Sequence, residues 1–296
     1  MRTILEFTSG SEALLLFNDR PENDFTRLAR TVDTLPAPKT KGTRRVFTAM
    51  VPRSFYEPVI PAASIDIGFS LACLHHLHHV DPRPADQTPT DAARQTTLRR
   101  HAHTDLQRFL SLRGREFVRG GSLVLSFVSQ ASTGEANYAG PVQACRDALV
   151  EMVREGLLPA AAAAEFEVPT YNRNMEDVRA TLDEEPVQRD WAVEEVCEKR
   201  VVHPAAEELA AARRSGDGRM DERRYGHTIV DWLMAVVAGY FTKMLQVGLG
   251  ERYCEAEGER LLQAWVERTK RRFVEDHADE EVACWFIYVR LRRRGD

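Results

Sequence analysis

A carboxylate at the end of an apolar run is the feature of the sequence best suited to chemistry. Residues 13–17 form the run, and Asn18 and Asp19 follow it directly, ahead of Pro21. α/β folds bind ligands at the carboxyl ends of buried strands, and a carboxylate there can accept two hydrogen bonds from the hydroxyls of a ribose. The same residues suit an Asx turn, because Asn and Asp before proline are common in turns. The sequence leaves both interpretations of Asp19 open.

A serine and an aromatic residue follow a second expected strand, Arg45–Val51. Ser54 and Phe55 would lie on the same rim of the sheet as Asp19, where a hydroxyl and an aromatic face could flank an adenine ring. Alternatively, Ser54 caps a short helix near residues 54–59 and Phe55 packs in the core. From spacing alone the structural interpretation is the stronger.

Four histidines follow a third expected strand, Ile65–Ser70. On a helix, His75 and His79 would share a face, but no carboxylate completes a metal site and no H-E-x-x-H motif occurs, so we expect no metal. We expect His75 or His76 to point into a pocket at the end of the strand, where an imidazole can hold an anion or move a proton. The alternative is a polar, partly exposed helix face, to which His78 and His79 would belong.

The pattern of apolar runs predicts an α/β fold. Strands are expected at 13–17, 45–51, 65–70 and 122–128, and helices at 23–32, 54–59 and 92–118, with Gly120-Gly121 ending the last of these and an exposed loop at 81–91. This alternation predicts a parallel sheet with helices on its faces. Beyond residue 129 we expect helices at 148–158, 175–182, 227–249 and 252–274, extended pieces at 166–171 and 191–202, and a last strand at 282–291. We therefore expect an α/β core from 1–130 and 281–296, and a mostly helical cap from 131–280.

Composition excludes several classes of protein. Hydrophobic residues make up 43% of the 296 residues and charged residues 29%, which is ordinary for a globular protein. A net charge of -5 gives no basic footprint, so we expect no nucleic-acid partner. The five cysteines are scattered without a C-x-x-C pair, which favours reduced thiols in the cytosol. We find no apolar stretch near the ~20 residues of a membrane span and no signal peptide, so we expect a cytoplasmic protein without a membrane partner.

Several segments together resemble one known family. In chain order they are F-N-D-R-P-E-N-D-F at 17–25, V-P-R-S-F-Y at 51–56, the stretches 64–77 and 109–127, A-L-V-E-M-V-R-E-G-L at 148–157, and F-E-V-P-T-Y at 166–171 followed by E-D-V at 176–178. On these motifs, whose order and spacing hold over most of the chain, it resembles the SABATH family of S-adenosylmethionine-dependent carboxyl methyltransferases. The resemblance implies a Rossmann-like class I methyltransferase sheet with a helical cap, S-adenosylmethionine as cofactor and a small carboxylic acid as substrate.

The resemblance assigns roles to the cofactor-side residues. Asp19, with Arg20 beside it, would hold the ribose, and Ser54 and Phe55 would flank the adenine. The family's acidic Gly-rich cofactor loop is absent, and so is the first strand of the sheet, unless Arg2–Phe7 stands in for it. Two functions therefore stay open: a carboxyl methyltransferase, or a catalytically inactive or truncated relative that acts as a binding or dimerisation module.

The resemblance also assigns the acceptor side. His75 and His76 occupy the places of the family's Met-Trp pair, and His76 would replace the Trp nitrogen as donor to the substrate carboxylate, with its charge favouring an anion. Val142 stands where the family has an aromatic wall of the substrate pocket. A carboxylate is already ionised, so direct in-line methyl transfer needs no general base and we expect no catalytic dyad. Members of the family are often dimeric, which makes a homodimer an expectation.

Overall fold

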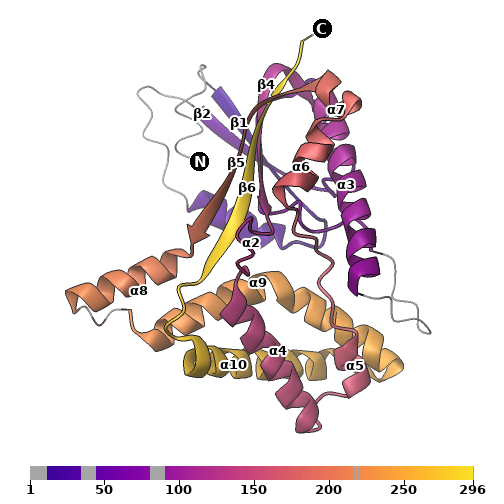
Figure 1. Ribbon diagram of the computed structural model, residues 1–296. Coiled ribbons are helices and arrows are strands. Elements are labelled where there is room, and N and C mark those ends of the chain that lie inside the picture. Colours follow the sequence, from indigo (N-terminus) through magenta and orange to yellow (C-terminus); the bar gives the residue numbers. More distant parts are fainter. Residues whose placement is uncertain (1–11, 35–44, 81–90, 217, 219, 296) are drawn as a thin grey trace.

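The computed structural model describes residues 12–34, 45–80, 91–216, 218 and 220–295. The predicted loop at 81–90 and the Arg2–Phe7 segment lie outside these residues. The described chain forms two β-sheets, a layer of helices on one face of the larger sheet, and a group of helices below the ends of its strands (Figure 1).

The strands make a parallel pair and a four-stranded mixed sheet. β1 (Glu12–Asp19) and β2 (Arg45–Pro52) are parallel, in register from Glu12 against Arg45 to Asp19 against Pro52. The larger sheet has the order β3-β4-β6-β5, built from β3 (Ile65–Leu71), β4 (Phe117–Val128), β5 (Trp191–Val202) and β6 (Ala283–Arg293). β3 and β4 are parallel, whereas β6 is antiparallel to both of its neighbours.

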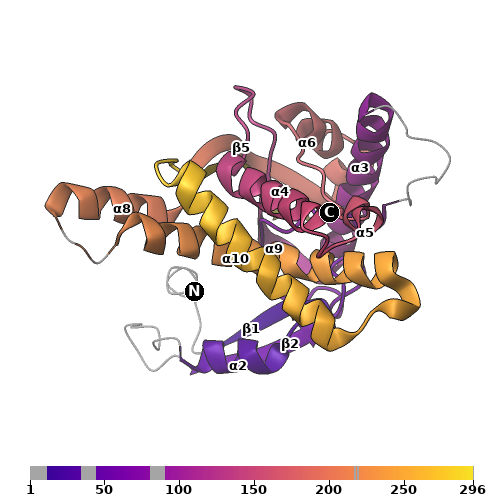
Figure 2. The same ribbon diagram turned by 90° about the horizontal axis from the view of Figure 1, so that it is seen from below.

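Helices pack on two sides of the larger sheet. α3 (Asp91–Glu116), α6 (Met175–Leu182) and α7 (Glu185–Asp190) cover one face. The cap consists of α4 (Ala139–Arg154), α5 (Ala160–Ala164), α8 (Pro204–Ser215), α9 (Glu222–Leu249), the short η1 (Gly250–Arg252) and α10 (Glu255–His277). Seen from below, α4 and α10 lie in front of α9, while α2 (Phe25–Asp33) lies beside β1 and β2 (Figure 2).

The cap and the sheet have separate hydrophobic cores. In the cap, the fully buried Trp265 stacks on Phe241 with ring centroids 4.6 Å apart. In the sheet core, Trp191 of β5 packs edge-on against Phe117 of β4, and its indole nitrogen donates to the carbonyl of Leu110 in α3. Two cores let the cap be a distinct layer over the carboxyl ends of β3 and β4, where ligands bind in such sheets.

The two sheets are not joined to each other by any strand pairing among the described residues. In a doubly wound sheet the first strand lies between the positions that β1 and β3 occupy here, and no described strand fills that place. Apolar side chains are exposed on both sides of it: Leu14 and its cross-strand partner Phe47 on one, Phe69 and Leu71 on the other. The order of the described strands agrees with that of a class I methyltransferase sheet in which the described residues leave the place of the first strand open.

Most elements expected from the sequence are confirmed. They include the strands at 13–17, 45–51, 65–70, 122–128, 191–202 and 282–291 and the helices at 23–32, 92–118, 148–158, 175–182, 227–249 and 252–274. The predicted cap block, 131–280, needs correction, because β5 pairs with β6 in the sheet and α6 and α7 contribute to the sheet core. Hydrophobic periodicity marked these segments as packed without showing against which core.

Two local predictions are wrong. Residues 54–59 form turns and not a short helix. The histidine segment forms a turn and a bridge from His76 to Thr170, so the alternative of a polar helix face does not apply to it. Gly120 and Gly121 lie inside β4, not at the end of α3. The pairing of β3 with β4 shifts register between Ile65 and Ile67, and Gly120 there has a φ of 77°, which glycine adopts without strain.

One described segment is long and apolar enough to cross a membrane, contrary to the expectation from the sequence. It runs from Glu222 to Arg252 and thus comprises α9 with η1. Length and composition alone also describe a core helix. Buried side chains of α9, among them Tyr225, Ile229 and Phe241, belong to the cap core.

Candidate active site

The carboxylate of Asp19 stands at the end of β1, as predicted. Its Oδ1 accepts a hydrogen bond from the backbone N–H of Arg20 at 2.7 Å, and Oδ2 accepts one from Asn23 Nδ2 at 3.0 Å. Asp24, one residue further on, caps α2 by accepting from the N–H of Arg27. These contacts do not form an Asx turn, because the N–H two residues on would belong to Pro21, which has none; the turn is closed instead by the N–H of Asn23, which donates to the carbonyl of Arg20 at 3.0 Å. The Asp19 carboxylate keeps acceptor capacity for a ribose, because the side chain is exposed and a carboxylate has about four lone-pair positions.

Asn18 fastens the loop after β2 to the end of β1. Its Nδ2 donates to the carbonyls of Val51 at 2.9 Å and Arg53 at 2.7 Å, and the N–H of Arg53 donates to the carbonyl of Asp19 at 2.8 Å. The residue after Arg53 is Ser54. The predicted adenine-flanking residues are thus held directly beside the predicted ribose acid.

Ser54 and Phe55 form a turn in place of the expected helix. The hydroxyl of Ser54 accepts from the N–H of Tyr56 at 3.2 Å, and the ring of Phe55 lies edge-on to Phe109 of α3 with centroids 6.1 Å apart. Arg113 of α3 donates to the carbonyl of Phe55 at 3.0 Å. Phe55 is half-buried, so one part of its ring packs on the core and the rest faces outward.

The backbone of the His75–His76 segment is held on several sides. The carbonyl of His75 accepts from the N–H of Tyr171 at 2.9 Å, and the carbonyl of His76 accepts from the hydroxyl of Tyr56 at 2.9 Å. His76 also forms the bridge to Thr170. Since the turn follows β3, the structure brings both imidazoles to the carboxyl end of that strand, as expected. His78 and His79 are exposed, as expected, although not on a helix.

The two rings have different neighbours. They lie 4.2 Å apart between centroids, and Nδ1 of His75 is buried without a hydrogen-bond partner among the described residues. Nδ1 of His76 lies 3.3 Å from the hydroxyl of Tyr240 in α9. Tyr240 is the cap residue that sequence reasoning missed. An aromatic residue at helical spacing within an apolar helix has the pattern of a core residue, so no signal distinguished it.

Burial keeps both imidazoles neutral. Burial, and then the neighbouring His76 and Arg173, lower the pKa of His75 to about 3. Burial, and then the charge of Arg20, lower the pKa of His76 below its usual range. The lowered pKa disfavours the charged His76 that the resemblance implies, and a neutral ring recognises an anion through an N–H.

The loop after β2 connects the ends of β1 and β3, because the carbonyl of Arg53 accepts from Asn18 and Tyr56 donates to the carbonyl of His76. Arg20 is near enough to His76 to lower its pKa, and Asp19, after burial, raises the pKa of the Cys73 thiol. The structure thus brings the predicted cofactor residues and the predicted acceptor residues to one region. Val142 lies half-buried in the first turn of α4, whereas Tyr240 supplies the contact from the cap to His76.

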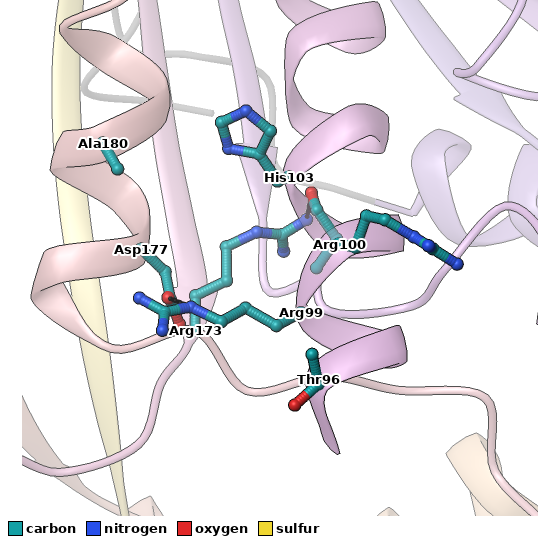
Figure 3. Close-up of a pocket in the computed structure, with 8 residues that line it drawn as sticks. Thr96, Arg99, Arg100, His103, Arg173, Asp177 and Ala180 are labelled. Carbon is teal, nitrogen blue, oxygen red and sulfur yellow. Dashed lines mark hydrogen bonds and ion pairs between the residues drawn. The ribbon is translucent and has the colours of Figure 1, made fainter. Parts of the chain in front are cut away.

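A pocket of about 310 Å³ lies elsewhere, between α3 and α6 (Figure 3). Arg99 reaches across it to Asp177 with its Nε 2.5 Å from Oδ1, and Arg173 extends toward α3, where it donates to the carbonyl of Ala102. Arg173 also donates to the carbonyl of Leu74, directly before His75. None of the predicted site residues lines this pocket. Arg173 connects this pocket with the site, because it lines the pocket and also holds the backbone next to His75.

The described residues contain no group of three or more His, Cys, Asp or Glu side chains that could hold a metal ion. The polar and aromatic groups described at the strand ends are the exposed carboxylate of Asp19, the hydroxyl of Ser54 with the ring of Phe55, and the imidazoles of His75 and His76.

Comparison with known proteins identifies relatives over nearly the whole chain. A family model described as SAM dependent carboxyl methyltransferase matches residues 8–293. Methyltransferase LUC1 from Fusarium sp is 50% identical over 297 residues, which cover 99% of this chain and 80% of that protein. O-methyltransferase acrG from Aspergillus aculeatus is 50% identical over 290 residues, which cover 96% of this chain and 76% of that protein.

More distant matches extend the comparison to plants and to a solved structure. Indole-3-acetate O-methyltransferase 1 of Arabidopsis thaliana is 29% identical over 195 residues, 58% of this chain and 50% of that protein. The solved structure of a loganic acid methyltransferase with S-adenosylhomocysteine superposes with a TM-score of 0.69 and 22% identity, covering 99% of this chain and 77% of that one. At this identity the superposition shows that the folds agree.

Proposed function

The chain belongs to the S-adenosylmethionine-dependent carboxyl methyltransferases of the SABATH family, and from this premise we propose how its residues divide the work. The region at the ends of β1, β2 and β3 binds the nucleoside of the cofactor, and the region under α9 binds the carboxylate of a small acid. The observation that carries the proposal is that the loop after β2 contacts both regions: the carbonyl of Arg53 accepts from Asn18 at the end of β1, and the hydroxyl of Tyr56 donates to the carbonyl of His76 after β3.

The residues present fit the nucleoside half of S-adenosylmethionine. Asp19 is exposed and can accept from the two ribose hydroxyls, while Arg20 flanks it. Phe55 offers the outward part of its ring to an adenine face, and Ser54 offers a hydroxyl at the ring edge. The Asn18 contacts hold these groups together, so the half-site is preorganised. The cofactor, when bound, supplies an electrophilic methyl group on its sulfonium sulfur.

The residues on the acceptor side fit a carboxylate. A neutral His76 can donate one hydrogen bond to a carboxylate oxygen, and the unpartnered Nδ1 of His75 can pair with a further polar group of the acid. Tyr240 of α9 contacts His76 from the cap, which supports a site that is shielded in part from water. The names of relatives that methylate indole-3-acetate and loganic acid support a carboxylic acid acceptor.

The chain's contribution to the reaction is orientation and desolvation. A carboxylate is ionised at neutral pH and is itself the nucleophile, so the residues need only hold one of its oxygens in line with the methyl group. A weakly solvated carboxylate is a better nucleophile than a hydrated one, and a neutral imidazole binds it without the ion pair that would quench it. This division of roles requires no general base.

The proposal is tested by transfer of an isotopically labelled methyl group from S-adenosylmethionine to a panel of small acids, with product identified by mass spectrometry. The panel contains aromatic, indole, fatty and terpenoid acids, and the matched alcohols and phenols serve as controls. We expect a methyl ester of at least one acid, and an Asp19→Ala variant with strongly reduced yield at limiting cofactor. Methylation of the alcohols alone, or of no compound, would contradict a carboxyl-directed activity. A cytoplasmic location and a homodimer stay predictions.

A further inference from the structure

Tyr240 connects the cap to the acceptor side of the site. Its hydroxyl lies 3.3 Å from Nδ1 of His76, and the planes of the two rings are only 9° apart. Both side chains are half-buried, and Tyr240 belongs to α9, which is anchored in the cap core by Phe241 and Leu245. The contact therefore ties the position of the His76 ring to a rigid element.

We propose that Tyr240 is a positioning residue that selects the tautomer of His76 for recognition of the acceptor carboxylate. The Tyr240 hydroxyl donates to Nδ1, which places the single proton of the neutral ring on Nε2. Nε2–H is then the donor to the carboxylate oxygen. The inference rests on the proposed function, whose acceptor it assigns to one atom of His76.

The tautomer matters because His76 is neutral. An imidazolium would carry a proton on both nitrogens, so Tyr240 would have nothing to select. His76 is surrounded by Arg20, His75 and Tyr240, and no acidic side chain is among the groups that shift its pKa. In a neutral ring the position of the one N–H is directed by the hydrogen bond that the other nitrogen accepts.

Hydrogen bonds fix the backbone of His76, so only its imidazole ring can still rotate. Its carbonyl accepts from Tyr56 at 2.9 Å, its N–H donates to the carbonyl of Cys73 at 3.1 Å, and its bridge partner is Thr170. With the main chain fixed, ring rotation and proton position decide which atom meets the acceptor. Tyr240 controls both through one contact.

The first test needs neither cofactor nor turnover. Long-range proton–nitrogen correlation spectra of protein labelled with ¹⁵N-histidine report the tautomer of each ring, and the His76→Gln variant identifies the His76 signals. We expect the wild type at pH 7.5 to hold the Nε2–H form alone, and Tyr240→Phe to show a mixture of both forms. A wild-type ring with the proton on Nδ1, or an unchanged spectrum in Tyr240→Phe, would overturn the inference.

The second test distinguishes selection of the His76 tautomer from a general packing effect of the Tyr240 side chain. We expect Tyr240→Phe to raise KM for the acid about 3- to 10-fold, the factor for loss of one neutral hydrogen bond, with little change in kcat. The His76→Gln side chain carries its N–H near the position of Nε2 and does not tautomerise, so adding Tyr240→Phe to it should have no further effect. An equal effect of Tyr240→Phe in both backgrounds would contradict tautomer selection. Absence of methyl ester from the wild type, together with the expected spectra, would reject the proposed function and leave the contact itself established.

Discussion

Replacing Glu116 by glutamine should destabilise the protein by breaking a buried ion pair under the site. The Glu116 side chain is only 5% exposed, and its carboxylate lies 2.7 Å from Nε and 2.9 Å from Nη2 of Arg113, which is 9% exposed. The same carboxylate accepts from the N–H of Val59 at 2.7 Å. Glutamine keeps the shape and one acceptor but removes the charge.

The magnitude follows from the burial of the partner. Removing one member of a buried pair costs about 3–5 kcal/mol, because the other charge stays buried without compensation. Glutamine preserves an oxygen for Val59, so we expect the lower end, about 3 kcal/mol in the free energy of unfolding. Arg113 also donates to the carbonyls of Phe55 and Glu57, so the loop that carries Phe55 should loosen in parallel.

Urea denaturation at pH 7, followed by circular dichroism, measures this loss. A double variant, Glu116→Gln with Arg113→Met, leaves no uncompensated charge, so its cost should be smaller than the sum of the two single costs, although the carbonyls of Phe55 and Glu57 also lose their donor. Glu185→Gln breaks an exposed pair with Arg189 and should change stability by less than about 0.5 kcal/mol. A cost of Glu116→Gln below about 1 kcal/mol, or a double variant as unstable as the sum of the singles, would refute the reasoning.

Three further perturbations have defined outcomes. The pKa of His75 is lowered to about 3 in the folded chain, so between pH 6.5 and 3 the unfolded chain binds a proton that the folded chain does not. The free energy of unfolding therefore decreases by about 1.4 kcal/mol for each unit by which the pH is lowered in this range. His75→Asn should flatten this dependence in a urea series from pH 7 to 5, and parallel curves would contradict the assignment. Arg173→Met should cost roughly 3 kcal/mol in the same assay, because two buried carbonyls lose their donor; a neutral result would show that other groups satisfy them. Trp265→Ala should lower the free energy of unfolding by about 3–5 kcal/mol, whereas Val247→Ala on the exposed side of α9 should change it by less than about 0.5 kcal/mol, and similar effects of the two would argue against a distinct cap core.

Regular elements were predictable wherever local patterning and packing agree. The helix Met175–Leu182 begins after Asn174, which forms a capping box with Asp177, and its bounds follow from the sequence directly. The strand Trp191–Val202 was also predicted, but its place in the sheet was not. Its partner, β6, lies some 90 residues further along the chain, and no local pattern encodes that pairing.

Site residues were predictable where both partners of a contact lie in one short motif. Asp19 and its turn were found because strand, carboxylate and proline are adjacent in sequence. The turn at Ser54–Phe55 was mistaken for a helix because Arg113, which fixes its carbonyls, is about 60 residues away. The same holds for Tyr240, whose contact with His76 spans 164 positions and whose pattern matches that of a buried core residue.

The central claim is that Asp19 at the end of β1 holds the cofactor ribose. Titration calorimetry with S-adenosylhomocysteine tests it most directly, comparing the wild type with Asp19→Ala and with Asp24→Ala, which removes a nearby carboxylate that only caps α2. The account predicts saturable one-to-one binding to the wild type, affinity at least about 10-fold weaker in Asp19→Ala, as expected for loss of a charged hydrogen-bond acceptor, and near-wild-type affinity in Asp24→Ala. Absence of binding to the wild type at millimolar ligand, or equal affinity in Asp19→Ala, would contradict it.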